Sequence, residues 1–188
     1  MRIIAGEAKG RTLYAPPGSE TRPTSDKIRG SLFNIIGSRV ADARVLDLFG
    51  GTGALALEAL SRGAELAVIA DNSRAALQMI ERNARAVLGD DFDFRASVLR
   101  LDYRSAIEAV SGQLFDLVFL DPPYRMVEAY GEALSRLYAA QMLAPGCLIV
   151  MERTKSAVVP LPKPFRVFDT RLYSDTAVDF AEIGATEE

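Results

Sequence analysis

The sequence predicts an α/β protein built on a doubly wound, mostly parallel sheet. From residue 44 onward, short apolar runs alternate with stretches of helical periodicity, which is the pattern of repeated strand–helix units. The run at 115–120 is almost continuously apolar, as is typical of a parallel strand buried on both faces. In such a sheet, ligand-binding residues follow the carboxyl ends of the strands, so these positions are where a site is expected.

The strand–helix units divide most of the chain, and their crossovers are expected to be right-handed. Strands are predicted at 44–48, 66–70, 92–99, 115–120 and 147–151, and near 165–172 and 177–183. Helices are predicted from the glycine-rich turn after residue 48 to about residue 62, and at 73–88, 103–111 and 127–143.

The first 40 residues are expected to form an extension of short strands and one helix, ahead of a domain spanning 41–188. The helix is predicted to run from an N-cap at Thr24 or Ser25 to about Ile36, with Gly37 able to end it. The extension holds seven Lys/Arg and three acidic residues, whereas the rest of the chain holds 15 and 22. A basic segment on an acidic body suits an anionic partner, although a merely solvated surface would have the same composition.

Composition excludes several kinds of chemistry. The 188 residues include no histidine, which excludes Ser-His-Asp and Cys-His catalysis and histidine metal sites. The one cysteine, Cys147, lies in an apolar run and is expected to be a small core residue rather than a nucleophile. We therefore expect no metal, and chemistry that depends on carboxylates, backbone groups, aromatic rings, Arg or Lys, or a cofactor.

The same features bear on location. One cysteine allows no internal disulfide, and no apolar run approaches the roughly 18 residues of a membrane-spanning helix. The start of the chain lacks the apolar stretch of a secretory signal. The sequence thus predicts a cytoplasmic protein that does not enter a membrane.

A glycine-rich turn, Asp47-Leu-Phe-Gly-Gly-Thr-Gly53, follows the first predicted strand. Glycines at a strand-to-helix turn let the backbone approach a ligand closely. Asp47 would repel a pyrophosphate at the helix N-terminus, but it suits a cationic group such as the amino group of an amino acid. The alternative is a tight structural turn in which Asp47 caps the helix.

Two more acids follow predicted strands. Asp71 comes 24 residues after Asp47, a spacing at which an acid accepts hydrogen bonds from ribose hydroxyls. Asp102 follows the third strand and could accept from an adenine amino group. Helix capping is the alternative at both places, near Ser73 and by Asp102 itself.

The sharpest signal is Asp121-Pro-Pro-Tyr124 after the fourth strand. Two prolines forbid helix and further strand pairing, so they fix a rigid loop. A carboxylate and a proline carbonyl can then accept both protons of one exocyclic amino group, while Tyr124 stacks on the base. Held in this way, the amino group can direct its lone pair at an electrophile. The alternative is a rigid turn with an incidental tyrosine.

Motifs along nearly the whole chain carry a family resemblance. They are Met1-Arg-Ile-Ile-Ala-Gly, Lys9-Gly-Arg11, Thr21-Arg-Pro-Thr24, Asp26-Lys-Ile-Arg29, Leu32-Phe-Asn-Ile35, the run 47–63, Asp121-Pro-Pro-Tyr124 and Tyr173-Ser-Asp-Thr176. In these the chain resembles the bacterial family of Rossmann-like, S-adenosylmethionine-dependent methyltransferases that methylate guanine N2 of 16S ribosomal RNA. The Thr-Arg-Pro-Thr helix entry is the most specific of them.

The resemblance implies a role for each matching position. S-adenosylmethionine would be held by Asp47, Phe49, Gly50, Gly51, Gly53, Asp71, Asn72, Asp102 and Tyr103. The target amino group would be held by Asp121, Pro122, Pro123 and Tyr124. Ribosomal RNA, in a small-subunit particle or an assembly intermediate, would be the partner, and the candidate contacts in the basic extension are Lys9, Arg11, Arg22, Lys27 and Arg29. The chain departs from the family at Gly30, usually glutamate, and at Ser174, usually glycine.

Other functions stay open at this point. An adenine-N6 methyltransferase acting on DNA or RNA can use the same Asp-Pro-Pro-Tyr device, although 188 residues leave no evident target-recognition domain for DNA. Pyrimidine C5 methylation would need a thiolate in the active site, and Cys147 is not placed to supply one. An NAD-dependent oxidoreductase would leave Asp47 and Asp121 unexplained. A non-catalytic RNA-binding module would have no need for the set of acids at the strand ends.

Overall fold

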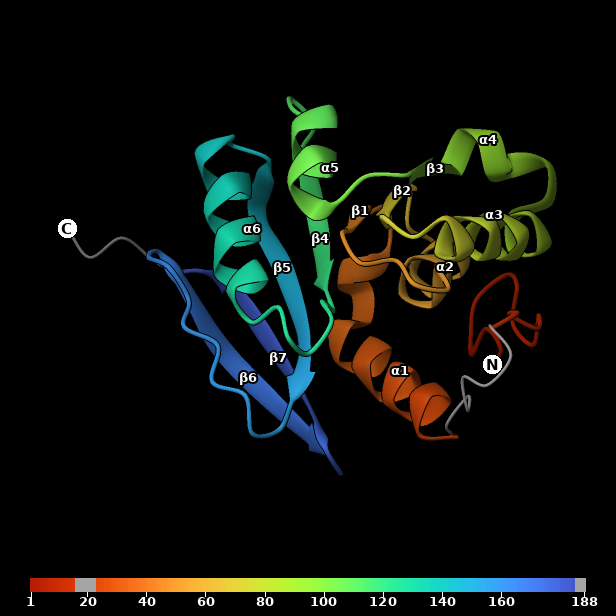
Figure 1. Cartoon of the computed structure of the whole chain (residues 1–188). Coiled ribbons are helices and arrows are strands. Elements are labelled where there is room, and N and C mark those ends of the chain that lie inside the picture. Colours follow the sequence, from red (N-terminus) through yellow and green to blue (C-terminus); the bar gives the residue numbers. More distant parts are fainter. Residues whose placement is uncertain (16–22, 185–188) are drawn as a thin grey trace.

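The computed structural model describes residues 1–15 and 23–184, which form a seven-stranded mixed sheet with helices on both sides (Figure 1). The strands are β1 (Arg44–Asp47), β2 (Leu66–Ala70), β3 (Ala96–Leu99), β4 (Phe115–Leu120), β5 (Leu143–Thr154), β6 (Phe165–Tyr173) and β7 (Thr176–Ile183). Their order is β3-β2-β1-β4-β5-β7-β6. The first five strands are parallel and β7 is antiparallel to both β5 and β6. This confirms the doubly wound, mostly parallel sheet.

The helices agree closely with the sequence pattern. They are α1 (Pro23–Ile36), α2 (Ala54–Ser61), α3 (Arg74–Leu88), α4 (Phe92–Arg95), α5 (Tyr103–Ala109) and α6 (Glu128–Ala139), with 3-10 turns η1 (Gly37–Val40) and η2 (Gly89–Asp91). Helix α1 begins at Pro23, so the predicted caps Thr24 and Ser25 lie within its first turn, and Gly37 continues into η1 rather than ending the helix. No helix of the described residues is long and apolar enough to cross a membrane.

The structure corrects the strand predictions in two places. The strand expected from residue 92 begins only at Ala96, because residues 92–95 form α4. The spacing of Phe92 and Phe94 would place both rings on one face of a strand, but on the helix Phe92 is buried while Phe94 is 86% exposed. Of the short strands expected near the N-terminus, residues 1–15 form only an isolated bridge between Arg2 and Thr12.

The core lies in two layers because side chains alternate across each central strand. Val45 of β1 packs with α1, α2 and α3 on one face, whereas the next residue, Leu46, packs with α5 and α6 on the other. Apolar residues of the predicted extension, such as Ile3 and Leu32, belong to the first layer. The division of the chain at residue 40 stays a prediction.

A buried glutamate on α2 attaches the first residues of the chain to the sheet. The carboxylate of Glu58 is fully buried and accepts the backbone N–H groups of Ile4 at 2.8 Å and Ala5 at 3.0 Å. It also pairs with Arg62 at 2.7 Å and with Arg29 at 3.5 Å. A buried charge is tolerated only when it is paired and hydrogen-bonded, and here two cations and two amides satisfy it.

Glu58→Gln should lower the free energy of unfolding by about 3 kcal/mol, because it leaves the buried Arg29 guanidinium short of a counter-charge. Urea unfolding at neutral pH measures the change. Glu65→Gln, at an exposed position in the loop before β2, serves as the matched control and should be neutral. Equal unfolding midpoints for both variants would show that Glu58 does not stabilise the fold through its charge.

Candidate functional site

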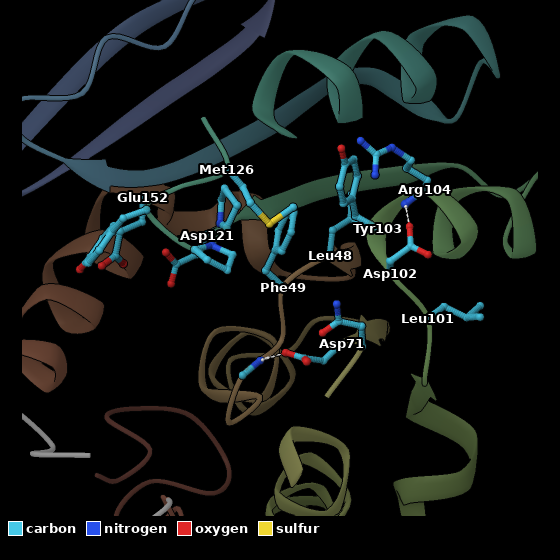
Figure 2. A pocket seen from close by; sticks show the side chains of 15 residues that line it. Leu48, Phe49, Asp71, Leu101, Asp102, Tyr103, Arg104, Asp121, Met126 and Glu152 are labelled. Carbon is cyan, nitrogen blue, oxygen red and sulfur yellow. Dashed lines mark hydrogen bonds between the residues drawn. The ribbon is translucent and has the colours of Figure 1, made fainter. Parts of the chain in front are cut away.

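A cavity of about 630 Å³ opens at the carboxyl ends of the parallel strands, where the fold class places a ligand. Each of the five parallel strands contributes to its lining, through Phe49 after β1, Asp71 after β2, Asp102 after β3, Asp121 after β4, and Glu152 within the end of β5. Figure 2 shows Asp121 and Glu152 at one end of the cavity, Asp102 and Leu101 at the other, and Phe49 between them.

The glycine turn packs tightly against β2. A Cβ atom on Gly50 would lie 2.5 Å from Cγ2 of Ile69, so only glycine fits there, and the Gly50 N–H donates to the carbonyl of Ala70 at 2.8 Å. Gly53 has φ of 78° and begins α2, a backbone conformation that favours glycine. Gly51 lines the cavity, whereas Gly50 and Gly53 shape the turn beneath it.

Asp47 lies under this turn rather than on the cavity wall. Asp47 is only 2% exposed, and its carboxylate accepts the Phe49 N–H at 3.3 Å. Burial raises the pKa of Asp47 to about 7, the Phe49 hydrogen bond opposes this shift, and the nearby Asp71 carboxylate adds to it. The buried carboxylate therefore favours a cationic neighbour.

Asp71 ties the glycine turn to the end of β2. Its carboxylate accepts the Gly51 N–H at 3.0 Å (Figure 2). It also accepts the Ser73 N–H at 2.8 Å. The N-cap of α3 is Ser73, whose hydroxyl accepts the Ala76 N–H. Helix capping, the alternative to ribose binding, is therefore the role of Ser73 and not of Asp71. Asp71 and Asn72 both face the cavity.

Asp102 is the N-cap of α5, as its capping alternative predicted. It accepts the Arg104 N–H at 2.9 Å and the Ser105 hydroxyl at 2.9 Å, and these bonds, led by that of Ser105, lower the pKa of Asp102. Asp102 nevertheless lines the cavity, as does Tyr103, the next residue in the chain. The Tyr103 ring packs against Phe49 with centroids 5.4 Å apart, and its hydroxyl donates to Glu132 at 2.7 Å.

A second cavity of about 310 Å³ adjoins the Asp121–Tyr124 loop. Its walls combine polar side chains, Arg29 of α1 and Thr176 of β7, with apolar residues from α1, α2 and the start of the chain: Met1, Ile28, Leu32, Ala54 and Leu55. Asp121, Tyr124 and Glu152 line both cavities, so they mark the place where the two meet. Tyr124 is 68% exposed there.

The Asp121–Tyr124 loop leaves one proline carbonyl available. The Pro123 carbonyl accepts the Met126 N–H at 2.8 Å, whereas the Pro122 carbonyl has no hydrogen-bond donor within the described residues. The predicted pairing of a carboxylate with a proline carbonyl therefore applies to Asp121 and Pro122.

Acidic groups crowd the junction of the cavities. Burial, then the nearby Glu152 and Asp47 carboxylates, raise the pKa of Asp121 well above its usual value. Burial also raises the pKa of Glu152. Within residues 1–15 and 23–184, neither the Asp121 nor the Glu152 side chain forms a hydrogen bond or an ion pair with the protein. These carboxylates are available to hydrogen-bond donors on a ligand.

Comparison with known proteins assigns the chain to a family. The model of the family described as "Conserved hypothetical protein 95" matches residues 1–182. The chain belongs to this family. The Bacillus subtilis relative "Putative rRNA methyltransferase YlbH" is 38% identical over 162 residues, which cover 85% of this chain and 86% of the relative.

Two further proteins agree with that assignment. "Ribosomal RNA small subunit methyltransferase D" of Escherichia coli is 38% identical over 125 residues, covering 66% of this chain and 61% of the relative. The solved structure "Putative methyltransferase yhhF" from Escherichia coli superposes with a TM-score of 0.84 at 32% identity, covering 99% of both chains. The resemblance to a family of ribosomal RNA methyltransferases is therefore confirmed.

Glu152 is the site residue that sequence reasoning missed. The apolar run 147–151 predicts a strand, and Glu152 follows it directly, as the other candidate acids follow theirs. Its position after an apolar strand was the available signal. The strand continues past it to Thr154, so Glu152 is held by strand pairing rather than by a loop.

The five basic candidates do not form one exposed set. Lys9, Arg11 and Lys27 are exposed. Arg29 is 4% exposed, pairs with Asp26 at 2.9 Å and with Glu58, and lines the smaller cavity. It therefore has a structural role, and its role as an RNA contact stays a prediction. Arg22 lies outside the described residues.

The pKa of Asp47 gives a testable pH dependence. Because the folded-state pKa is raised from 3.8 to about 7, the folded protein binds a proton more tightly than the unfolded chain, and Asp47 lowers stability progressively as pH rises from about 4 to 7. The shift corresponds to at most about 4 kcal/mol. Asp47→Asn should therefore flatten the fall in unfolding free energy over this range, measured by urea titration of the ligand-free protein.

The control for that titration is Asp90→Asn, at an exposed position in η2, which should leave the wild-type slope unchanged. An Asp47→Asn slope equal to that of wild type would mean that Asp47 ionises as freely in the folded protein as in the unfolded chain.

Proposed function

We propose that this protein transfers a methyl group from S-adenosylmethionine to the exocyclic N2 amino group of a guanine in small-subunit ribosomal RNA. The observation that carries the proposal is the meeting of two cavities at Asp121, Tyr124 and Glu152. A two-substrate transfer needs a place where both reactants touch, and these residues offer acceptors and an aromatic face there. The relatives named as ribosomal RNA methyltransferases support the choice of RNA.

The larger cavity fits the cofactor. Its volume of about 630 Å³ is typical of small-molecule sites, roughly 300–1,000 Å³, and it combines apolar walls with acids from successive strands. In this proposal Asp47 compensates the amino group of the methionine part beneath the Gly50–Gly53 turn. Asp71 and Asn72 bind the ribose, and Asp102 and Tyr103 lie beside the adenine. When bound, S-adenosylmethionine supplies a methyl group carried on a positively charged sulfur.

The smaller cavity receives the target base. The Asp121 carboxylate and the Pro122 carbonyl accept the two N2 protons, which orients the nitrogen lone pair toward the larger cavity. Tyr124 stacks on the flipped base. As the bond from N2 to the methyl carbon forms, the bond from that carbon to sulfur would break, and its electron pair would stay on the sulfur, which becomes a neutral thioether. Positive charge develops on N2, and the nearby carboxylates stabilise it and receive the proton that leaves. The lack of histidine in the sequence is no obstacle, because carboxylates, a backbone carbonyl and an aromatic ring supply the groups that this site needs.

The exposed cations near the start of the chain give the acidic protein a local surface for RNA phosphates. Lys9, Arg11 and Lys27 are the described candidates, and Arg22 remains one on the sequence alone. Phosphate contacts of this kind position an RNA without reading its sequence. We propose a small-subunit particle or an assembly intermediate as the substrate, with the target nucleotide to be mapped.

The competing functions would leave different parts of the site without a role. An oxidoreductase acting with NAD, or a module that only binds RNA, would have no use for two acceptors and a stacking ring where two cavities meet. Adenine N6 is also an exocyclic amino group, so Asp121, Pro122 and Tyr124 alone do not distinguish it from guanine N2.

The decisive experiment is transfer of labelled methyl groups to small-subunit particles from unmodified cells, followed by mass spectrometry of the nucleosides. The wild-type protein should yield N2-methylguanosine at one position. Asp121→Ala should lower kcat by about 100- to 1,000-fold, since it removes an acceptor that acts in the transition state. Its affinity for S-adenosylmethionine, measured by calorimetry, should change less than about threefold.

Asp90→Ala is the control for that assay, because Asp90 lines neither cavity, and it should retain wild-type transfer. Methyladenosine as the product would overturn the guanine assignment. A loss of cofactor affinity in Asp121→Ala equal to the loss of rate would mean that Asp121 holds the cofactor rather than the base.

Lys9→Ala combined with Arg11→Ala should weaken RNA binding and make it less dependent on salt. Removing one phosphate interaction should reduce the slope of log affinity against log salt concentration by roughly 0.7 for single-stranded RNA. A salt titration of RNA binding measures this, with cofactor affinity as the control. An unchanged slope and affinity would show that the first residues only cover the sheet and that RNA docks elsewhere.

A further inference from the structure

Glu152 is a carboxylate without a partner among the described residues, placed where the two cavities meet. It lines both cavities together with Asp121 and Tyr124. An acid that serves only to hold the fold has protein partners, as Glu58 does with two arginines and two amides. Within residues 1–15 and 23–184 the Glu152 side chain has none. A half-buried carboxylate that faces two cavities and has no partner among the described residues is available to a ligand that brings hydrogen-bond donors.

The backbone of Glu152 is held rigidly on two sides. It pairs with Val178 in the antiparallel ladder between β5 and β7, and its carbonyl accepts the Tyr130 hydroxyl from α6. Asp121 follows β4, and β4 is the parallel neighbour of β5. The two carboxylates thus project from adjacent strands, and Figure 2 shows both at the same end of the larger cavity.

Two neighbouring carboxylates present acceptors only when both are ionised. Their raised pKa values in the ligand-free protein disfavour that state, and a ligand that donates hydrogen bonds to both carboxylates restores it. Guanine has a matching edge, because its N1–H and N2 amino group place donors side by side. The corresponding edge of adenine combines the N6 amino group with N1, a lone-pair acceptor that would face a carboxylate. Cytosine likewise pairs its amino group with an acceptor, N3. Of these three bases, only guanine can donate a hydrogen bond to each of the two carboxylates. This selectivity is independent of the RNA sequence around the target base.

We propose that Glu152 makes the site specific for guanine by accepting N1–H while Asp121 holds the N2 amino group. This inference rests on the proposed function and adds a specificity-determining residue to it. Sites built to accept a substrate N–H reject analogues that lack it strongly, by up to about 10,000-fold, because the buried acceptor is left unpaired. The remaining wall of the smaller cavity combines apolar residues with Arg29 and Thr176, and neither of these two side chains can accept the guanine N1–H as a carboxylate does.

The test compares two bases that carry the same 2-amino group. Small-subunit RNA is assembled into particles with either guanine or 2-aminopurine at the methylated position, since 2-aminopurine lacks N1–H. Labelled methyl transfer gives kcat/KM for each. The wild-type protein should prefer guanine by about 100-fold or more. In Glu152→Gln this preference should fall by at least about tenfold, because the amide can donate to N1 of 2-aminopurine.

Glu128→Gln is the matched control, since Glu128 is exposed on α6 and lines neither cavity, and it should keep the wild-type preference. A merely structural role for Glu152 would lower both rates equally and leave the ratio unchanged, which overturns the proposal. If Glu152→Gln does not fold, Glu152→Asp is assayed instead. It should lower the guanine rate and still reject 2-aminopurine, and a wild-type rate on guanine would overturn the proposal.

Failure of the proposed function has a different signature. In that case the wild-type protein would methylate adenine, or no base, in unmodified particles. Methylation of guanine by wild type, together with an unchanged preference in Glu152→Gln, would overturn the role of Glu152 alone.

Discussion

Three carboxylates without counter-ions among the described residues stand at the ends of three adjacent strands, and the organisation of the site depends on this crowding. Asp47, Asp121 and Glu152 belong to β1, β4 and β5, which are neighbours in the sheet. Asp47 is buried and the other two are half-buried. Water solvates carboxylates better than the protein does here, so their placement lowers the stability of the free protein. The strand ladders and the rigid proline loop hold them in place nonetheless. A ligand rich in cationic and N–H groups relieves this electrostatic cost on binding.

The start of the chain has two tasks in this arrangement. Glu58 and Asn83 tie it to the body of the protein, the former through Ile4 and Ala5 and the latter through Tyr14, whose N–H donates to Asn83 at 2.7 Å. This attachment places Met1 on the wall of the smaller cavity. It also leaves Lys9 and Arg11 exposed on the surface. The segment thus shapes the cavity proposed for the base while presenting positive charge to solvent.

Local patterns predicted most of the fold. The glycine turn, the apolar runs and the helical periodicity predicted β2 and β4 at their observed bounds and α3 within a residue. The pattern could not distinguish a helix turn from a strand at 92–95, because alternating phenylalanines satisfy both until tertiary packing buries one of them. Nor could it show that the bridge between Arg2 and Thr12 is isolated, since pairing depends on how the segment packs on α2.

Part of the candidate site could be predicted from the sequence and part could not. Acids after strands were found because the fold class says where to look, and Asp71, Asp102 and Asp121 do line one cavity. Asp47 was found too, but its place beneath the turn depends on the path of the backbone. Arg29 shows the opposite failure, because sequence gives its charge and not its burial against Glu58. Ser174 has φ of 47°, so it occupies a backbone conformation that the family's usual glycine adopts without strain.

The burial of Arg29 has a consequence for mapping the surface that binds RNA. Scanning the basic residues of such a protein with alanine treats each drop in affinity as the sign of a phosphate-binding side chain. At Arg29 the same drop would come from a displaced N-terminal segment, because its guanidinium donates to the Arg2 carbonyl and pairs with Asp26. The drop at Arg29 would then report the loss of this attachment, and of a residue in the wall of the smaller cavity, rather than the loss of a phosphate contact on the outer surface. A footprint drawn from such data would be shifted from the true binding face toward the interior of α1.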